Sequence, residues 1–551
     1  MTVVLRDLLP ARLRRSWAVD GVCPDLDLYS LYRARQIADP HRAAVIDAKG
    51  KLCYTALDRR ARCMAAGLEG LGIRSGDVVG VQLPAGREAV VADIALAALG
   101  AVALPFPVGR GGREAVSLLG RSEAVAVIAA TEHRGSRHAA DLLALRDELP
   151  LLRAVVAAGP GVVPEGAVPL RELTRGDAHD FVPARPHPDA AARILVSSGS
   201  EAEPKMVAYS HNALAGGRGN FLGSLLTDGE PPRCLFLVPL ASAFGSSGTA
   251  VTLARHGGTL VVLDHFSPEA AVRALVEHRP THVLGVPTMV RMMLDRLAED
   301  GAAPFTPPTA LIVGGSPLDA ATAEEARRVF GCPVVNLYGS ADGVNCHTGL
   351  AAGPVAADGP GVLAGRPDPR VTDIRIALPG TAELEEAPPG AVGEIVARGP
   401  MSPLCYVAAP DLDARYRTAD GWVRTGDLGR LEEDGTLRVV GRLKDVVIRG
   451  GANISPAEVE LAIAAHPLVR DVVCVGVPDP LMGERLAVCL VGREGAELSL
   501  AELSAHLDAR GLERRKHPER LLHVAQLPLT PAGKPDRARV REWCGKQTAA
   551  A

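Results

Sequence analysis

The most informative stretch of the chain is RILVSSGSEAEPKMVAYSHNAL, at residues 193–214. The apolar run Ile194–Val196 predicts a strand, which enters a loop of small residues at 197–203. Backbone N–H groups and hydroxyls in such a loop can face phosphate oxygens, and Lys205 at its far end can neutralise their charge. The G-x-x-x-x-G-K-[ST] pattern of a Walker A loop is absent. On these residues alone, a flexible turn explains the segment equally well.

A second segment, VVNLYGSADG at 334–343, predicts a strand that delivers an aromatic residue into a turn. Tyr338 beside Gly339 could stack on a planar base, and the carboxylate of Asp342 could hold Mg²⁺ through oxygen. Taken alone, however, a strand end followed by a simple turn is the better explanation of this segment.

A third segment is GWVRTGDLGRLEEDGTLRVVGRLKDVVIRGGANISPAEVE, at 421–460. Asp427 lies in a turn between two glycines, where it could accept two hydrogen bonds from a ribose diol. It could equally serve only to form the turn. Arg442 and Lys444 follow a predicted strand, at a point where we expect one domain to end and another to begin.

A fourth segment, LPLTPAGKPDRARV at 527–540, places Lys534 in a turn rich in Pro and Gly. A lysine in such a loop is usually solvated, but this chain has only seven lysines against 53 arginines. Lysine is a compact point charge and arginine is a planar fork, so the two are not interchangeable. Because Lys205, Lys444 and Lys534 all lie in the four segments, we single them out as candidates.

Working outward from these segments, strand-like and helix-like runs alternate from residue 54 to about 360, which predicts parallel α/β sheets. From about 360, short strands between Gly- and Pro-rich turns predict an antiparallel subdomain. After about 445 the runs predict a small α+β domain, in which Ser455 and Glu458 mark a capped helix.

We therefore expect an α/β fold with two domains. The large N-terminal domain, residues 1–442, should contain two α/β subdomains and a small β-barrel-like subdomain. The small C-terminal domain, residues 443–551, should be α+β. The length is consistent with three to five structural units of this kind.

Composition excludes several classes of protein. The net charge of −4 argues against a strongly basic nucleic-acid binder. The ten cysteines are scattered without a C-x-x-C pair, so we expect reduced thiols in a cytoplasmic protein. The most apolar stretch, 94–108, is 15 residues long and contains Pro105, whereas a membrane span needs ~20 apolar residues. We expect no nucleic-acid or membrane partner and no secretory signal, and we allow for a dimer.

The four segments, in this order and spacing, resemble the adenylate-forming superfamily. That superfamily holds acyl-CoA ligases, adenylation domains of peptide synthetases, luciferases and amide synthetases, and the resemblance covers nearly the whole chain. The nucleotide-binding residues that it implies are Ser197, Ser198, Gly199, Ser200, Gly314, Gly315, Tyr338, Gly339, Asp427 and Arg442. The catalytic residues that it implies are Lys534, Lys205 and Asp342, with Asp342 also near the metal and Lys444 at the hinge.

The resemblance implies a reaction in two halves that uses ATP and Mg²⁺. A substrate carboxylate attacks the α-phosphate and releases pyrophosphate, while Lys534 and Mg²⁺ offset the charge that builds up. The C-terminal domain is mobile in this superfamily: it then rotates about the hinge, and a second nucleophile displaces AMP from the acyl-adenylate.

The chain departs from the family in its phosphate loop and in its adenine motif. The loop reads SGSEAEPKM instead of SGTTGxPKG, which places Glu201 and Glu203 beside the expected phosphates. The adenine motif ends in Ala341–Asp342 instead of Thr-Glu. Lys205, Lys534 and an acidic residue all remain, so we expect activity.

The segment LFLVPLASAFGSSG, at 235–248, corresponds to the strand that lines the acid site in the family. It has no acidic residue to hold an α-ammonium group, and Ser242 stands where many aryl- and fatty-acid ligases carry His. We therefore expect an aryl or other uncharged acid, bound near Ser242, Phe244 and Gly245. The alternative is that the small residues here serve only backbone packing.

For the acceptor, the loop and the YGSAD motif resemble aminocoumarin-type amide synthetases, so we place an amine first. CoA is the main alternative, as in acyl-CoA and aryl-CoA ligases, and a carrier protein is a third acceptor. Two further function classes compete: a catalytically weakened binding protein that kept the fold, and a hydrolase. The hydrolase is disfavoured because no G-x-S-x-G elbow occurs.

Overall fold

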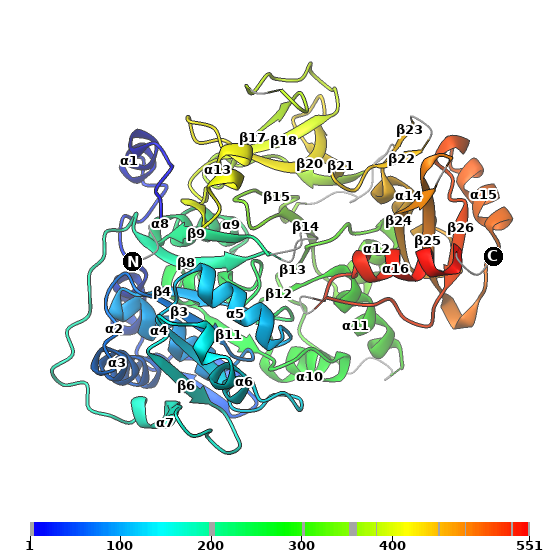
Figure 1. Ribbon diagram of the computed structural model, residues 1–551. Coiled ribbons are helices and arrows are strands. Elements are labelled where there is room, and N and C mark those ends of the chain that lie inside the picture. The colour runs from blue at the N-terminus through cyan, green and yellow to red at the C-terminus, as the bar shows by residue number, and fades with distance from the viewer. Residues whose placement is uncertain are drawn as a thin grey trace.

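Four sheets organise the chain, and the two largest are mostly parallel (Figure 1). The computed structural model describes residues 5–197, 204–299, 304–351, 361–381, 383–449, 452–479, 481–530 and 533–548. The expected fold class is confirmed: two α/β units and an antiparallel sheet form the large part, and a smaller α+β unit follows.

The first eight-stranded sheet has the order β15-β14-β13-β12-β10-β11-β1-β2, and its pairs are parallel except at its two edges. Its strands are β1 (Ala43–Asp47), β2 (Gly50–Cys53), β10 (Arg233–Phe236), β11 (Thr259–Val262), β12 (His282–Gly285), β13 (Ala310–Gly314), β14 (Val334–Gly339) and β15 (Asn345–His347). Strands β11, β12 and β13 are buried along their whole length, as continuous apolar runs in a parallel sheet require.

The second eight-stranded sheet has the order β19-β9-β8-β4-β3-β5-β6-β7. Its strands are β3 (Val78–Gln82), β4 (Val102–Pro105), β5 (Ala126–Ala130), β6 (Ala154–Ala158), β7 (Val168–Pro169), β8 (Ala191–Val196), β9 (Met206–Ser210) and β19 (Cys405–Tyr406). The strand expected before the phosphate loop is β8, and it pairs antiparallel with β9 on the other side of that loop.

Helices connect and cover these two sheets. They are α1 (Ala11–Val19), α2 (Leu28–Ala38), α3 (Tyr54–Gly70), α4 (Arg87–Leu99), α5 (Gly112–Arg121), α6 (His138–Ala144), α7 (Leu170–Leu173), α8 (His211–Ala215), α9 (Gly217–Gly223), α10 (Pro268–His278), α11 (Pro287–Glu299) and α12 (Ala320–Phe330), with a π-helix at Gly248–Arg255 and a 3₁₀ turn at Arg146–Glu148. Helix α4 is apolar around most of its circumference and contacts strands of both sheets, which makes it a buried helix rather than a membrane span.

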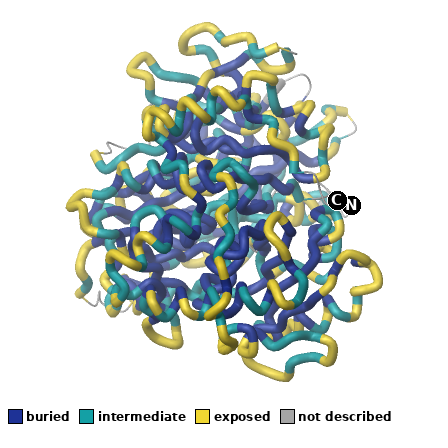
Figure 2. The backbone as a smooth tube through the Cα atoms, turned by 90° about the vertical axis from the view of Figure 1, so that its left-hand side faces the viewer, coloured by how far each residue is buried: buried dark blue, intermediate teal, exposed yellow. Residues whose placement is uncertain are grey.

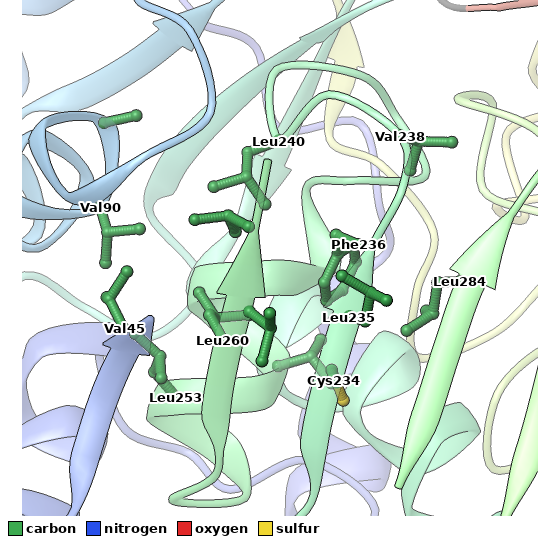
Figure 3. Packing of buried hydrophobic residues seen from close by; sticks show 14 of the residues in the cluster. Val45, Val90, Cys234, Leu235, Phe236, Val238, Leu240, Leu253, Leu260 and Leu284 are labelled. Atoms are coloured by element: carbon green, nitrogen blue, oxygen red, sulfur yellow. The ribbon is translucent and has the colours of Figure 1, made fainter. Parts of the chain in front are cut away.

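The core between the sheets is assembled from segments far apart in the sequence (Figure 3). Val45 of β1, Val90 of α4 and Leu260 of β11 lie close together, and Leu235 and Phe236 of β10 lie beside them. These side chains are 5% exposed or less, so at about 25 cal/mol per Å² of buried apolar surface they hold β10 firmly. The acid segment that follows β10 therefore starts from a rigid base.

The antiparallel subdomain and the C-terminal unit complete the fold, at the top and right of Figure 1. The subdomain has the order β16-β21-β20-β18-β17, formed by β16 (Val362–Gly365), β17 (Asp373–Ala377), β18 (Gly393–Arg398), β20 (Val423–Leu431) and β21 (Leu437–Arg442), with α13 (Pro410–Tyr416) beside it. The C-terminal sheet contains β22 (Val447–Arg449), β23 (Ala452–Ile454), β24 (Val469–Asp479), β25 (Gly483–Gly492) and β26 (Arg520–His523). Its helices are α14 (Pro456–Ala464), α15 (Leu500–Ala509) and α16 (Arg537–Thr548), with 3₁₀ turns at Arg493–Gly495 and Arg514–Lys516.

One local expectation is wrong. Ser455 occupies the N-cap position of α14, but its side chain makes no capping hydrogen bond. The hydroxyl instead donates to the carbonyl oxygen of Val440, at 2.8 Å. A tertiary partner has replaced the local one, and Ser455 ties the start of α14 to β21 across the expected domain junction.

In Figure 2 the exposed segments, in yellow, lie mainly at the periphery of the molecule, and the buried segments, in dark blue, lie mainly in its interior. Most residues of α4 are buried. Within the part of the chain that the structure describes, none of the helices combines the length and the apolar character that crossing a bilayer requires.

Candidate functional site

The candidate residues gather at the carboxyl edge of the first sheet, where loops leave parallel strands. Gly314 is the last residue of β13 and Gly315 follows it, while Tyr338 and Gly339 are the last residues of β14, shortly before Asp342. The acid segment follows β10 in the same sheet. Ligands of open α/β sheets bind at this edge, so the topology alone brings the Gly314–Gly315 pair, the Tyr338 segment and the acid segment into one region.

Asp427 is the centre of a hydrogen-bond network. The phenol of Tyr338 donates to Asp427 Oδ2 at 2.8 Å, and Nε of Arg442 donates to Oδ1 at 2.8 Å. The carboxylate is 4% exposed, and this burial raises its pKa while Arg442 opposes the rise. Each carboxylate oxygen has a second lone pair, so the same group can still accept from a ribose diol.

Lys534 reaches this network from the C-terminal unit. A Cβ placed on Gly315 would lie 3.0 Å from Cε and 3.6 Å from Nζ of Lys534. Gly315 also has a φ of +88°, a conformation that residues with side chains rarely adopt. Glycine at 315 therefore serves both the turn and the approach of the lysine.

The turn that carries Lys534 is closed by its own hydrogen bonds. Thr530 N donates to the Lys534 carbonyl oxygen at 2.7 Å, and Lys534 N donates to Thr530 Oγ1 at 3.2 Å. Burial, with a further contribution from Arg442, lowers the pKa of Lys534 from 10.5 to about 8, although Asp427 opposes the shift. The ammonium group thus sits where added negative charge would stabilise it.

Lys205 and Asp342 form a second cluster. Nζ of Lys205 lies 3.8 Å from Asp342 Oδ1, which also accepts a hydrogen bond from Tyr406 at 2.7 Å. The same ammonium lies 4.2 Å from the centre of the Tyr416 ring, close enough for a cation–π contact. Lys205 and Asp342 are about 15% exposed, so the pair is held in a fixed and largely dry position.

The two ends of the phosphate loop are joined by hydrogen bonds. Ser197 N donates to the Lys205 carbonyl oxygen at 2.9 Å, and Lys205 N donates to Ser197 Oγ at 3.1 Å. Ser198, Gly199 and Ser200 lie outside the described residues.

The remaining candidates have different surroundings. Nζ of Lys444 lies 5.8 Å from the centre of the Tyr416 ring, in the turn between β21 and β22. The Ser242 hydroxyl donates to the Pro239 carbonyl oxygen at 2.8 Å and accepts from Gly245 N at 2.9 Å, so it closes a turn. Gly245 has no room for a side chain, because a Cβ would lie 2.0 Å from the Pro239 oxygen. Phe244 is half-buried at the edge of the core.

Sequence reasoning found Tyr338 but missed three other tyrosines, Tyr209, Tyr406 and Tyr416. The chain has only seven, and four of them contact candidate residues or the segments that carry them: Tyr209, Tyr338, Tyr406 and Tyr416. Scarcity was the signal that singled out the lysines, and the same signal would have found these side chains.

The residues fit ATP with a metal ion held mainly by its phosphates. Among the described residues, no cluster of three or more potential metal ligands exists. Asp342 provides one carboxylate beside the loop, and Mg²⁺ in nucleotide sites commonly uses one or two carboxylates together with the substrate phosphates. No dedicated metal cage is therefore required.

The C-terminal unit is seated on the large part through an ion pair. Arg291 of α11 lies between Asp319, at 3.1 Å, and Asp471 of β24, at 2.7 Å. Nearby, a Cβ on Gly533 would lie 2.8 Å from Met289 Cε, so the lysine turn packs closely on the same helix. These contacts hold Lys534 at Gly315.

Comparison with known proteins agrees with this geometry. Residues 33–407 match the AMP-binding enzyme family, and residues 458–534 match the AMP-binding enzyme C-terminal domain. The chain belongs to the AMP-binding enzyme family. It is an ATP-dependent, adenylate-forming ligase, as the sequence resemblance predicted.

Three proteins illustrate the similarity. The chain is 33% identical to triostin synthetase I of Streptomyces triostinicus, covering 91% of each chain. It is 32% identical to 2-hydroxy-7-methoxy-5-methyl-1-naphthoate–CoA ligase of Streptomyces carzinostaticus, covering 92% of this chain and 91% of the relative. The structure of the amide bond synthetase McbA from Marinactinospora thermotolerans matches with a TM-score of 0.79 and 26% identity, over 94% of this chain and 99% of McbA.

A first prediction concerns the pH dependence of adenylation. Since the pKa of Lys534 is lowered to about 8, its cation is present below that pH and is lost above it. We expect kcat/KM for ATP–pyrophosphate exchange to fall as pH rises through about 8, an assay that needs no acceptor. In Lys534→Arg the charge persists, so the remaining activity should show no fall near this pH. An unchanged fall in that variant would assign it to another group.

A second prediction concerns domain seating. Asp471→Asn keeps the shape but removes one charge from the pair with Arg291, and a partly buried pair contributes about 1 kcal/mol, or roughly fivefold. Adenylation should slow by that factor, while acyl transfer from added acyl-adenylate should not slow. Asp508→Asn, which weakens a pair with Arg514 inside the C-terminal unit, is the matched control. Equal slowing of both half-reactions would contradict the assignment.

Proposed function

We propose that this ligase activates an aryl carboxylic acid as its acyl-adenylate and transfers the acyl group to an amine. The observation that carries the first half is the position of Lys534, which lies against Gly315 beside the Asp427 and Arg442 pair. The ammonium group of Lys534, the buried carboxylate of Asp427 and the ring of Tyr338 thus lie in one region, to which both proposed domains contribute. We place the boundary between these domains at 442/443, with Lys444 as the hinge.

The proposed roles are those that the resemblance to the adenylate-forming superfamily implies. Tyr338, Gly339 and the Gly314–Gly315 pair line the adenine, and Asp427 accepts from the ribose with Arg442 beside it. Loop residues 197–200 and Lys205 hold the phosphates.

In the first half-reaction a carboxylate oxygen of the acid forms a bond to the α-phosphorus, and the bond from that phosphorus to the pyrophosphate oxygen breaks. Lys534 offsets the negative charge that develops on the α-phosphate and the attacking carboxylate. Asp342 would hold Mg²⁺, which when bound neutralises phosphate charge. In the second half-reaction the amine nitrogen bonds to the acyl carbon, AMP leaves, and the nitrogen loses a proton.

The proposed acid is aryl because the segment 235–248 offers no carboxylate to an α-ammonium group. Gly245 and Gly248 serve close packing rather than an open pocket, because a Cβ on them would lie 2.0 Å from the Pro239 oxygen and 2.7 Å from Leu240 Cδ2, respectively. The naphthoate named for one relative is an acid of this kind.

We propose an amine as the acceptor for two reasons. The phosphate loop and the YGSAD motif resemble those of aminocoumarin-type amide synthetases, and the fold is similar to that of McbA, which is an amide bond synthetase. A thiol is the second candidate. It is favoured by the naphthoate–CoA ligase, which has the higher sequence identity. CoA and the thiol of a carrier protein are the two forms that this acceptor would take.

A third prediction separates the half-reactions. Lys534→Ala should slow pyrophosphate exchange by about 10²–10³, the effect of removing one group that stabilises charge in a transition state. Transfer from preformed acyl-adenylate should persist. Lys546→Ala, at a surface lysine paired with Glu542, is the control and should leave exchange unchanged. Loss of both half-reactions in Lys534→Ala would contradict its role.

A fourth prediction tests acid and acceptor in sequence. Exchange should occur with benzoate-type acids and not with α-amino acids. With the best acid, we expect AMP release to rise on adding an amine, with an amide detected by mass spectrometry. If AMP release depends on CoA and amines have no effect, the enzyme is a thioester ligase and the assignment as an amide synthetase is wrong. ATP binding without exchange for any acid would favour the weakened binding protein.

A further inference from the structure

Arg218 is buried beside the acid segment, and the residues on both sides of it are glycines. It opens α9 within AGGRGN, and it is 6% exposed. A Cβ on Gly217 would lie 2.3 Å from Met401 N, and a Cβ on Gly219 would lie 2.7 Å from Arg255 Cγ. Glycine on both sides therefore lets the helix approach its neighbours closely enough to take a guanidinium inside.

The guanidinium holds the acid segment directly. Nη1 of Arg218 donates to the Ala243 carbonyl oxygen at 2.8 Å and to Ser246 Oγ at 3.1 Å. Ser246 Oγ in turn donates to the same carbonyl oxygen at 2.7 Å. One buried side chain thus holds the backbone at 243–246 in addition to the hydrogen bonds of the Ser242 turn.

The same guanidinium reaches the Asp342 turn through a tyrosine. Its carbon lies 5.0 Å from the centre of the Tyr209 ring, a cation–π contact. The phenol of Tyr209 donates to the Ala341 carbonyl oxygen at 2.8 Å, one residue before Asp342. Tyr209 is fully buried, so this connection excludes water.

The environment of Arg218 differs from that of other buried arginines. Arg87 and Arg193 are buried to a similar degree, and each forms an ion pair with an aspartate, Asp47 and Asp93 respectively. Among the described residues, no carboxylate forms an ion pair with Arg218, and its Nε, like that of Arg193, has no hydrogen-bond partner. A buried, unpaired charge is costly, so its retention points to a role other than stability.

We propose that Arg218 is a positioning residue that fixes residues 242–246 of the acid segment and couples them to the Asp342 turn. The inference rests on the proposed function, which assigns that segment to the acid substrate. Arg218 sets the shape and affinity of the acid site without contacting ATP. Through Tyr209 it keeps the acid segment and the Asp342 turn in register, so the carboxylate and the phosphates meet at a fixed separation.

The test is pyrophosphate exchange with Arg218→Met and with Ser246→Ala, each compared with wild type. We expect KM for the acid to rise about tenfold in Arg218→Met and severalfold in Ser246→Ala, because a charge-assisted hydrogen bond is lost. KM for ATP should stay within about twofold in both variants, and Arg218→Lys should recover part of the acid affinity. Ser246→Ala removes a single oxygen, so it keeps the test decisive if Arg218→Met does not fold.

The control is Arg438→Met, since Arg438 is equally buried but pairs with Glu432 in the antiparallel subdomain. It should lower the melting temperature without changing KM for the acid. Tyr209→Phe tests the coupling, because its effect on kcat should vanish in an Arg218→Met background. The proposal would be overturned if Arg218→Met changed KM for the acid and KM for ATP equally, or changed neither. It would also be overturned if the effects of Tyr209→Phe and Arg218→Met on kcat simply multiplied in the double variant. A wild type inactive with every acid would instead refute the proposed function.

Discussion

Lys534 contacts Gly315 only while the C-terminal unit is docked on the large part. In that position it lies beside the carboxylate of Asp427, which already accepts hydrogen bonds from Tyr338 and Arg442. Burial works against both charges, since it raises the pKa of Asp427 and lowers that of Lys534. The docked site is therefore short of negative charge. On the proposed function a triphosphate supplies that charge, so we expect nucleotide binding and docking of the C-terminal unit to reinforce each other, and we expect the loss of pyrophosphate to weaken the docking.

The sequence identified the chemistry well because its rare residues are concentrated in it. Three of seven lysines lie in the four motifs, and the structure brings Lys534 and Lys205 to the same sheet edge from positions 329 residues apart. Regular runs also predicted the parallel strands, since a buried strand such as β13 is continuously apolar. Local periodicity and composition carry this information without any knowledge of tertiary contacts.

Other features depend on contacts that no local pattern encodes. Tyr406 and Tyr416 come from β19 and α13, outside every motif, and acquire their place only because β19 pairs with β9 next to the phosphate loop. Ser455 reads as a helix cap, but the carbonyl oxygen of Val440 lies within reach and takes the hydroxyl. Ser242 reads as a pocket residue, and its hydroxyl is used within a turn. In each case a partner brought by the fold decides the role.

The division between lysine and arginine has a physical reason in this site. An ammonium group can lose its proton when it is buried, and Lys534, with a pKa of about 8, is poised between the two states. Its affinity for the docked site thus changes with the charge around it, which suits a residue that must arrive and leave. Arg218 presents several donors in a fixed plane, so it can hold Ala243 and Ser246 at once. Lysine is thus used where the charge of the side chain must change with its surroundings, as at Lys534. Arginine is used where the geometry of the hydrogen bonds must stay fixed, as at Arg218.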